Sequence, residues 1–382
     1  MPPVPISDHD EESIHFLILS GANERAIVAS CRHLASEGIG FSIIARPRRD
    51  PLPRSPFRRH VIARRRQDCL DIEDIVATIH SVRDRMPKRV LYLPASEALN
   101  RLFLAHRDRL QKECRLEITL PSEAVYATVS DKASFNALAE TFRIAIPPTL
   151  PSADDAVLPF VAKPYREFSA QNGEKLYPEL ILTEGQRRAF LARTDSGEFF
   201  CQRYIDGTSY YYLFFFAPNG TVVSLIQRNL AQQPHGKSVL AAETSPDPDP
   251  VFHARIVDCI RSTGFTGFCM VEMMLDATGS YLIEANPRLW GPFSLALDAG
   301  FRLRWLATPL TASQPGPGHK TIRYAWLSGM LRTLLDGGSI RWFPNTRKHC
   351  LAHLISLVQS DVYLRRFDTI GMAWRELTHN NN

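Results

Sequence analysis

The sequence predicts an α/β protein in which an open parallel sheet precedes a part that is rich in β-hairpins. Roughly the first 120 residues alternate apolar strand patterns with helical patterns, the order that builds a parallel sheet. Farther along, two pairs of apolar segments are each joined by a short turn sequence, which indicates antiparallel hairpins. With 382 residues, the chain is long enough for two or three domains with real apolar cores.

Composition and charge argue against several classes of protein. The formal net charge of +5 is small for this length and does not by itself indicate a nucleic-acid partner. The seven cysteines form no zinc-site spacing, so we expect free thiols in a reducing cytoplasm. No apolar run approaches the ~20 residues that span a bilayer, and the proline-rich, acidic N-terminus lacks signal-peptide features. We therefore expect a cytoplasmic protein with no membrane and no nucleic-acid partner.

The first elements follow the order of a Rossmann-like domain. The segment that begins at Ile14 predicts a buried strand, 23–37 has helical spacing of apolar residues, and 41–45 predicts the next strand. A helical pattern over 70–86 and a strand over 90–94 continue the alternation. The turn after the first strand, Ser-Gly-Ala-Asn, lacks the full G-x-G-x-x-G pattern, so a dinucleotide is not the expected ligand.

An arginine-rich stretch interrupts this alternation. Nine Arg and four Pro fall among the twenty-one residues of 46–66. Such a run could attract an anionic substrate, a phosphorylated carrier or a membrane surface, and it is also typical of a solvated loop with edge strands. We assign this stretch no catalytic role.

The middle of the chain holds two lysines in distinctive places. Ser130-Asp131-Lys132 begins a predicted helix, because Ser or Asp can cap a helix N-terminus. The apolar strand over 159–164 contains a single charged residue, Lys163, which needs an anionic partner or a route to solvent. An apolar strand over 199–207 leads into a turn, and 210–227 predicts a hairpin with Arg228 at its end.

The segment 268–291 predicts a hairpin that carries a metal site. Its turn residues lie near Thr278, so Glu272 lies opposite or nearly opposite Glu284, and Asn286 shares a strand face with Glu284. Two carboxylates among apolar neighbours repel each other and lose hydration, a cost that a hard divalent cation offsets. All-oxygen ligands of this kind suit Mg²⁺, whereas the alternative is a hairpin whose Glu residues point to solvent. Arg288, just past a proline, adds a positive charge at the edge of the site.

These residues carry a resemblance to a known superfamily. Glu272, followed by Glu-Ala-Asn-Pro-Arg-Leu-Trp-Gly from Glu284, resembles the second half of the ATP-grasp signature, in which two acidic residues and an Asn hold magnesium ions against a triphosphate. Segments around Lys132, Lys163 and Gln202 occur upstream in the superfamily's order, and the resemblance covers approximately residues 14–310.

The resemblance implies an ATP-grasp fold, with an α+β nucleotide-binding part, preceded by an open parallel-sheet domain. We expect an N-terminal α/β domain over 1–125, the ATP-grasp domain over 126–310, and a C-terminal helical extension with a polar tail over 311–382. The extension carries no catalytic pattern. It could serve as a lid, as a dimer contact or as a substrate-specific cap. A homodimer is one assembly that we consider.

The resemblance also implies roles for individual residues. The two lysines reach nucleotide phosphates, the segment after the hinge strand clamps adenine, and Ser209 stands where many members bind ribose with an acidic residue. The loop 165–176 stands where members have a glycine-rich phosphate loop, but it has only one Gly. The expected nucleotide ligands are Lys132, Lys163, Gln202, Arg203, Tyr204, Ile205 and Ser209; the metal ligands are Glu272, Glu284 and Asn286; the catalytic candidates are Arg288 and Arg228.

The implied activity is that of an ATP-dependent carboxylate–amine ligase. A small-molecule carboxylate attacks the γ-phosphorus of ATP to form an acylphosphate, and an amine then displaces phosphate, leaving an amide, ADP and phosphate. The cofactors are ATP and two Mg²⁺ ions, for which Mn²⁺ is an expected substitute. A kinase, a carboxylase and a non-catalytic ATP-binding regulatory protein remain alternatives. The sequence identifies neither the carboxylate nor the amine.

Overall fold

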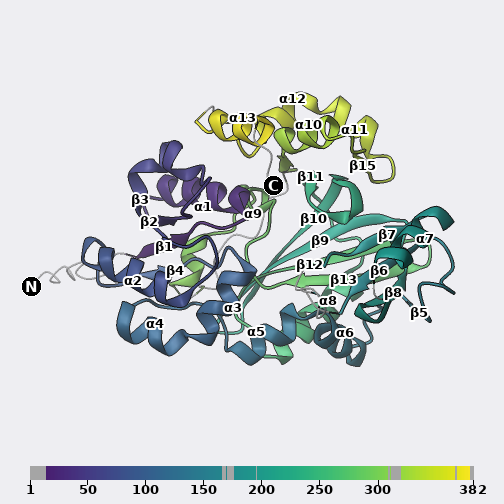
Figure 1. The fold of residues 1–382 in the computed structure, drawn as a ribbon, viewed down its shortest axis with the longest axis horizontal. Helices are drawn as coiled ribbons and strands as arrows, with labels where there is room; N and C mark the ends of the chain where they lie inside the picture. Colours follow the sequence, from purple (N-terminus) through teal and green to yellow (C-terminus); the bar gives the residue numbers. More distant parts are fainter. Residues whose placement is uncertain are drawn as a thin grey trace, which may run out of the picture.

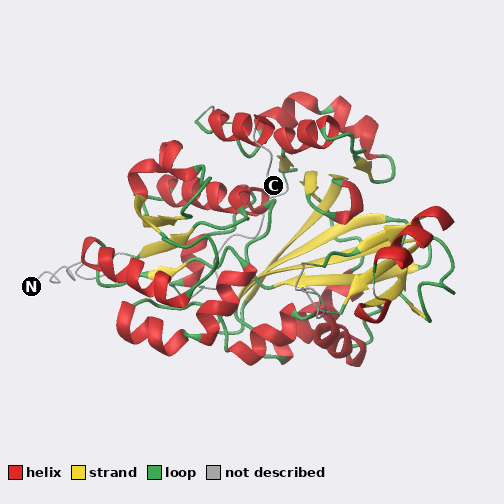
Figure 2. Cartoon of the chain, viewed as in Figure 1, coloured by secondary structure: helices red, strands yellow, loops and turns green. Residues whose placement is uncertain are grey.

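A computed structural model describes residues 14–165, 169, 176–194, 196–308, 310, 320–365 and 368–378. It contains three sheets, with helices around them (Figures 1 and 2). No helix within these ranges combines the length and the apolar character needed to cross a bilayer.

The N-terminal part is a four-stranded parallel sheet with helices on both faces, which confirms the predicted strand–helix alternation. The strand order is β3-β2-β1-β4. One face packs against α1, and the opposite face packs against α2, α3 and α4. The strands are β1 (His15–Leu19), β2 (Gly40–Ala45), β3 (Val61–Arg64) and β4 (Leu91–Tyr92); the helices are α1 (Glu24–Ser36), α2 (Ile72–Val82), α3 (Glu97–Ala105) and α4 (Arg107–Cys114).

A larger antiparallel sheet forms the centre of the molecule. Its strand order is β13-β12-β9-β10-β11-β14, and β15 pairs with β10. The strands are β9 (Thr208–Phe216), β10 (Val222–Gln232), β11 (Val239–Thr244), β12 (Gly267–Asp276), β13 (Gly279–Asn286), β14 (Arg323–Ala325) and β15 (Arg341–Trp342).

Both faces of this central sheet are buried. The aromatic side chains of β9 alternate between two apolar clusters, so they form core, as their continuous run predicts. One cluster joins the sheet to α5 (Glu123–Ser130), α6 (Lys132–Thr141) and α8 (Pro250–Ser262). The other joins it to α1 and to α9 (Phe293–Asp298), and thereby fixes the N-terminal part against the sheet.

A small antiparallel sheet lies at the far end of the central one (Figure 1). Its order is β5-β8-β6-β7, and α7 (Glu184–Arg193) packs on its outer side through Phe190. The strands are β5 (Thr149–Leu150), β6 (Phe160–Pro164), β7 (Glu179–Ile181) and β8 (Phe199–Arg203).

The chain after residue 320 forms a helical layer that also contributes two strands to the central sheet. Figure 1 shows this layer in yellow and yellow-green, along both the N-terminal part and the central sheet. The predicted helical patterns near 325–335 and 351–364 are present, but the strands β14 and β15 were not expected. The helices are α10 (Leu327–Leu335), α11 (Thr346–Ala352), α12 (Leu354–Gln359) and α13 (Ile370–Thr378).

Candidate active site

A β-bulge brings the two expected carboxylates together. Met273 pairs with Leu282, so an uninterrupted ladder would place Ile283 opposite Glu272. The register shifts at this point, Ile283 is left unpaired, and Glu284 pairs with Glu272. Side chains alternate along a strand, so without the shift Glu284 would face the other side of the sheet. The predicted pairing is confirmed, and the bulge is its physical cause.

A buried chain of hydrogen bonds orients Glu272. Ser209 Oγ donates to Glu272 Oε1 at 3.0 Å, and Asn229 Nδ2 donates to Ser209 Oγ at 2.7 Å. Gln227 Nε2 in turn donates to Asn229 Oδ1 at 2.7 Å, and all three residues are fully buried. Burial, and then the nearby charge of Glu284, raise the pKa of Glu272 to about 7.

Glu284 sits among cations and donors instead. Asn286 Nδ2 donates to Glu284 Oε1 at 2.7 Å, and Lys132 Nζ lies 3.6 Å from Glu284 Oε2. Arg288 Nη2 donates to Asn286 Oδ1 at 3.0 Å. Burial favours the neutral acid, but Lys132, Asn286 and Arg288 outweigh it, so the pKa of Glu284 lies below its ordinary value. The two carboxylates therefore differ in their readiness to ionise.

Lys163 faces this pair from the small sheet. It lies on β6, and only 8 % of the residue is exposed. Burial, and then the like charge of Lys132, lower the pKa of Lys163 to about 8, whereas Glu284 and Glu272 act in the opposite direction. A lysine held this way gains most from an additional anion, because its present partners do not offset its burial.

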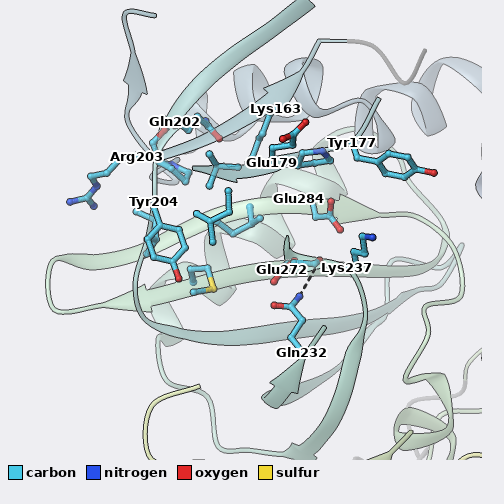
Figure 3. A pocket seen from close by; sticks show the side chains of 18 of the residues that line it. Lys163, Tyr177, Glu179, Gln202, Arg203, Tyr204, Gln232, Lys237, Glu272 and Glu284 are labelled. Carbon is cyan, nitrogen blue, oxygen red and sulfur yellow. Dashed lines mark hydrogen bonds between the residues drawn. The ribbon is translucent and has the colours of Figure 1, made fainter. Parts of the chain in front are cut away.

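One cavity of about 320 Å³ lies between the small and central sheets, and we call it the first cavity. The charged side chains of Lys132, Lys163, Glu272 and Glu284 border it. Figure 3 shows Lys163 and Gln202 on the small-sheet side and Glu272 and Glu284 on the central sheet. The expected residues that line it are Lys132, Lys163, Gln202, Arg203, Tyr204, Ile205, Glu272 and Glu284. Most of the site residues that the sequence predicted therefore line a single cavity.

The hinge after β8 forms one wall of the first cavity. Gln202 Nε2 donates to Pro147 O at 3.1 Å, while Gln202 Oε1 is buried without a partner among the described residues. A Cβ atom on Gly207 would lie 2.1 Å from Leu275 O, so only glycine lets the hinge run this close to β12. An orphaned buried acceptor at a cavity wall suits a ligand that carries an N–H donor.

Three expected residues lie beside the cavity rather than in its wall. Ser209 supports Glu272 and Asn286 supports Glu284, so both act on the carboxylates through hydrogen bonds. Arg288 is half-buried beside Asn286, and its Nε lies 3.8 Å from Glu97 Oε2. Ser209 is fully buried, so the structure does not place it where a ribose could be reached.

Arg228 does not belong to this site. Its neighbours Gln227 and Asn229 face Glu272, and strand alternation turns Arg228 to the opposite face of the sheet. There Arg228 Nη2 lies 2.5 Å from Glu243 Oε1, in an ion cluster that also contains Arg323 and His349. The geometry therefore places Arg228 in an ion pair outside the first cavity, and its expected catalytic role finds no support there.

Sequence reasoning missed several residues of the cavity wall. Lys237 and Gln232 come from the end of β10 and the turn after it, whose polar character was the only signal. Arg341 comes from β15, a two-residue strand for which the sequence offers no signal, and its guanidinium lies 5.3 Å from the ring centre of Tyr204. The expected phosphate loop over 165–176 lies, apart from residues 165, 169 and 176, outside the described residues.

The donor set suits a hard divalent cation. Glu272 and Glu284 offer carboxylate oxygens on one face, and Asn286 adds an amide oxygen. Lys132 and Lys163 line the same cavity and favour an additional anionic group. Within the described ranges no three His, Cys, Asp or Glu side chains gather into a metal site, so the carboxylates form a pair. Such a pair leaves coordination positions for water or for the oxygens of a ligand.

The arrangement of the sheets is that of the ATP-grasp fold. The structure is similar to biotin carboxylase from Campylobacter jejuni, solved as a β,γ-ATP complex, with a TM-score of 0.58, 15 % identity, and coverage of 78 % of this chain and 72 % of that one. It is also similar to the biotin carboxylase domain dimer of Hydrogenobacter thermophilus 2-oxoglutarate carboxylase, solved with MgADP and bicarbonate. That match has a TM-score of 0.55, 14 % identity, and coverage of 79 % and 71 %.

A third similar structure is pyruvate carboxylase from Rhizobium etli, with a TM-score of 0.57 and 15 % identity over 80 % of this chain. Only 30 % of that longer chain is covered. No protein-family profile and no curated protein sequence matches the chain. At this level of identity the likeness establishes the fold, and the activity has to be argued from the site.

Proposed function

We propose that the protein is an ATP-dependent carboxylate–amine ligase that forms an amide through an acylphosphate. The observation that carries the proposal is the pair Glu272 and Glu284, set opposite each other by the bulge and facing the buried Lys163 across one cavity. Two carboxylates opposite a partly uncompensated cation form a site that suits a metal ion together with a polyanion. A magnesium-bound nucleotide supplies both.

We place ATP in the first cavity with its base at the hinge. The base lies beside Gln202, Tyr204 and the backbone up to Ile205, where the unpaired Gln202 Oε1 can accept an N–H. The phosphates extend toward Lys132 and Lys163. The ATP and MgADP in the similar structures support this placement. Glu272, Glu284 and Asn286 would hold Mg²⁺, which neutralises phosphate charge when it is bound.

The residues of the chain position and neutralise the reacting groups. The acid's carboxylate oxygen attacks the γ-phosphorus, ADP leaves, and the amine then attacks the acyl carbon and releases phosphate. Lys163 and Lys132 stabilise the charge that moves to the leaving phosphates. Arg288, fixed by Asn286 and Glu97, steadies the acylphosphate. Phosphoryl transfer of this kind depends on positioning and charge, so these residue types are sufficient.

A carboxylase is the second candidate, because the similar structures are carboxylases and one contains bicarbonate. Bicarbonate would then be the acid, and carboxyphosphate would replace the acylphosphate. The first cavity and its metal residues would serve both reactions equally. Only the identity of the acid separates the two.

The test is ADP release from MgATP with a panel of carboxylic acids that includes bicarbonate, with hydroxylamine as a general amine. We expect ADP, phosphate and the acid's hydroxamate in equal amounts, and none of them when EDTA is present. Activity with bicarbonate alone would identify a carboxylase. ADP without free phosphate would identify a kinase, and no ADP with any acid would leave a binding protein.

A further inference from the structure

A second cavity, of about 810 Å³, lies between the N-terminal sheet and the C-terminal helices. Its N-terminal wall comes from the turn after β1 and the connection after β2, that is, from the carboxyl ends of parallel strands. Ligands of open α/β sheets bind at this edge. Trp326, Tyr363 and α13 close the opposite side. The cavity is thus built from three parts of the chain that are distant in sequence.

Arginine dominates the charge of this second cavity. Five arginines and three carboxylates line it, so positive charge is in excess. Three of these arginines, 46, 48 and 49, come from the arginine-rich stretch whose role the sequence left open. A wall of this kind favours an anionic occupant.

The ion pairs of the wall leave cationic groups available. Arg48 Nε lies 3.5 Å from Asp68 Oδ2, but the Arg48 side chain is 82 % exposed, so this pair is weak. Arg375, on α13, is half-buried and forms no ion pair with any described residue. Arg48 and Arg375 therefore face the cavity from opposite walls with charge that no strong partner neutralises.

Arg25 lines the second cavity where the N-terminal part meets the central sheet. Its guanidinium donates to Ser238 Oγ at 3.0 Å, to Val239 O at 3.2 Å and to Tyr324 Oη at 3.1 Å, and it lies 3.9 Å from the ring centre of Trp326. These partners are neutral groups that hold the guanidinium in place, and Glu376, in the wall of the same cavity, attracts its charge electrostatically.

The two cavities share a wall. Lys237 lines the first cavity, and the next residue, Ser238, lines the second. A Cβ atom on Gly291, three residues after Arg288, would lie 2.8 Å from Arg25 Nη2, so the loop that carries Arg288 runs directly against Arg25. An elongated molecule held by Arg25 would point one end toward Arg288 and the other into the second cavity.

We propose that the second cavity binds the non-nucleotide acid through a second anionic group, so that the substrate is a dicarboxylate or a phosphorylated carboxylic acid. Its reacting carboxylate lies beside Arg25 and Arg288, and its distal anion lies between Arg48 and Arg375. The inference rests on the proposed ligase function. It also distinguishes the acid from bicarbonate, which is far smaller than the cavity and carries no distal anion.

The test measures binding without turnover. Calorimetric titration measures the affinity for succinate, glutarate, adipate and O-phosphoserine, and for a monocarboxylate of similar length to each. The protein is first saturated with Mg²⁺ and a non-hydrolysable ATP analogue. Saturation keeps the probes out of the first cavity. We expect either the dicarboxylates or the phosphorylated acid to bind at least tenfold more tightly than the monocarboxylates of similar length. Whichever of the two classes binds more tightly identifies the distal anion as a carboxylate or a phosphate.

Two variants tie this binding to the second cavity. In the R48A/R375A double variant we expect the dianion preference to fall about tenfold or more, because charge-assisted contacts are lost. R347A is the matched control, since Arg347 is exposed on α11 and lines neither cavity. Circular dichroism and melting temperature establish that the variants are folded.

The outcomes separate this inference from the proposed function. Equal binding of dianions and monoanions, no binding at all, or an unchanged preference in the double variant would each refute the inference. K163M, which alters only the first cavity, should lose ADP formation and retain the dianion preference when the analogue is raised to a concentration that saturates this variant. Arginine-dependent dianion binding with no ADP formed from any acid would retain the site and reject the ligase.

Discussion

At the residue scale, the candidate site centres on two carboxylates that share a face but differ in environment. Glu272 is held by a neutral hydrogen-bond donor, and its pKa is raised. Glu284 lies beside cations, and its pKa is lowered. Their separation in pKa means that one negative charge is retained readily and the second is costly until a cation arrives. This is the physical reason to expect metal dependence.

The first prediction concerns Glu284. Replacing it with Gln removes the charge beside Lys132 but keeps the shape and an acceptor oxygen for the amide of Asn286, so we expect the fold to persist and ADP formation to fall by at least about a hundredfold. E140Q is the control, because Glu140 is exposed on α6. Turnover at the normal rate in E284Q would remove the metal-site assignment.

The second prediction concerns pH. The pKa of Glu272 is raised from 4.5 to about 7 in the folded protein, so the fold holds a proton that the unfolded chain releases in this window. Protonation therefore stabilises the metal-free fold, and this contribution is lost as pH rises through about 7. Urea unfolding in EDTA should show a free energy of unfolding that declines between pH 5 and 8 more steeply than in E272Q.

Magnesium provides the internal control for that measurement. A bound cation replaces the proton as the partner of the carboxylates, so saturating Mg²⁺ should raise stability more at pH 8 than at pH 5. If the free energy of unfolding varies with pH in the same way in the wild-type protein and in E272Q, with or without Mg²⁺, Glu272 is not the group responsible.

The residues that the sequence predicted well are those fixed by local geometry. The hairpin turn predicted that Glu272 and Glu284 lie opposite or nearly opposite each other, and strand alternation put Asn286 on the same face as Glu284; the bulge at Ile283 makes the pairing direct. Strand alternation also holds around Arg228, but the sequence does not show which face of its strand meets the cavity. The side chain lies on the other face, beside Glu243. Arg341 could not be found, since its position depends on a tertiary pairing and not on a local pattern.

At the element scale, the hinge and the hairpin depend on one close approach. Most strands and helices of the first 310 residues follow from apolar periodicity, because each has one or two faces in a core. The bulge at Ile283 and the short strands β14 and β15 do not, because a single unpaired residue and strands of two or three residues have no period.

The third prediction concerns that close approach. In G207A the added methyl would collide with the backbone of β12 at Leu275, so the hinge has to move away from the hairpin. We expect a loss of about 1–3 kcal/mol in the free energy of unfolding, with weaker ATP binding. Thermal or urea unfolding and calorimetric titration with MgATP measure the two effects.

G185A is the matched control for this hinge variant. Gly185 lies in α7, where the nearest atom to an added Cβ is Thr183 Oγ1 at 3.8 Å. The substitution should therefore be neutral or stabilise the helix by up to about 1 kcal/mol. Equal stability and equal ATP affinity in G207A and G185A would show that the hinge does not depend on this contact.

At the scale of the whole molecule, the C-terminal segment completes structures that begin elsewhere. β14 extends the central sheet beyond β11, and Tyr324, Tyr363 and Met372 join the apolar cluster that holds the N-terminal part to that sheet. Arg32 of α1 pairs with Asp368 at 2.6 Å. This segment is therefore part of the structural core, and it lines both cavities.

The fourth prediction tests this contribution without disrupting the core. Arg341 lines the first cavity between the rings of Tyr204 and Phe343, from which its guanidinium lies 5.3 Å and 4.9 Å. Its charge also acts on Glu272, so Arg341 acts electrostatically on the proposed metal ligands as well as lying beside the hinge. R341A should bind MgATP roughly tenfold more weakly, because a cation and a ring contact are lost together.

The salt dependence of that loss indicates its origin. A charge that acts on the triphosphate is screened by salt, so the gap between the wild-type protein and R341A should narrow as ionic strength rises, whereas a gap due to packing alone would not. R341K should recover part of the affinity, because it restores the charge without the planar stack. If R341A binds MgATP as tightly as R347A does, the C-terminal segment supports the nucleotide site only through the fold. The second cavity would then be the main place where this segment meets a ligand.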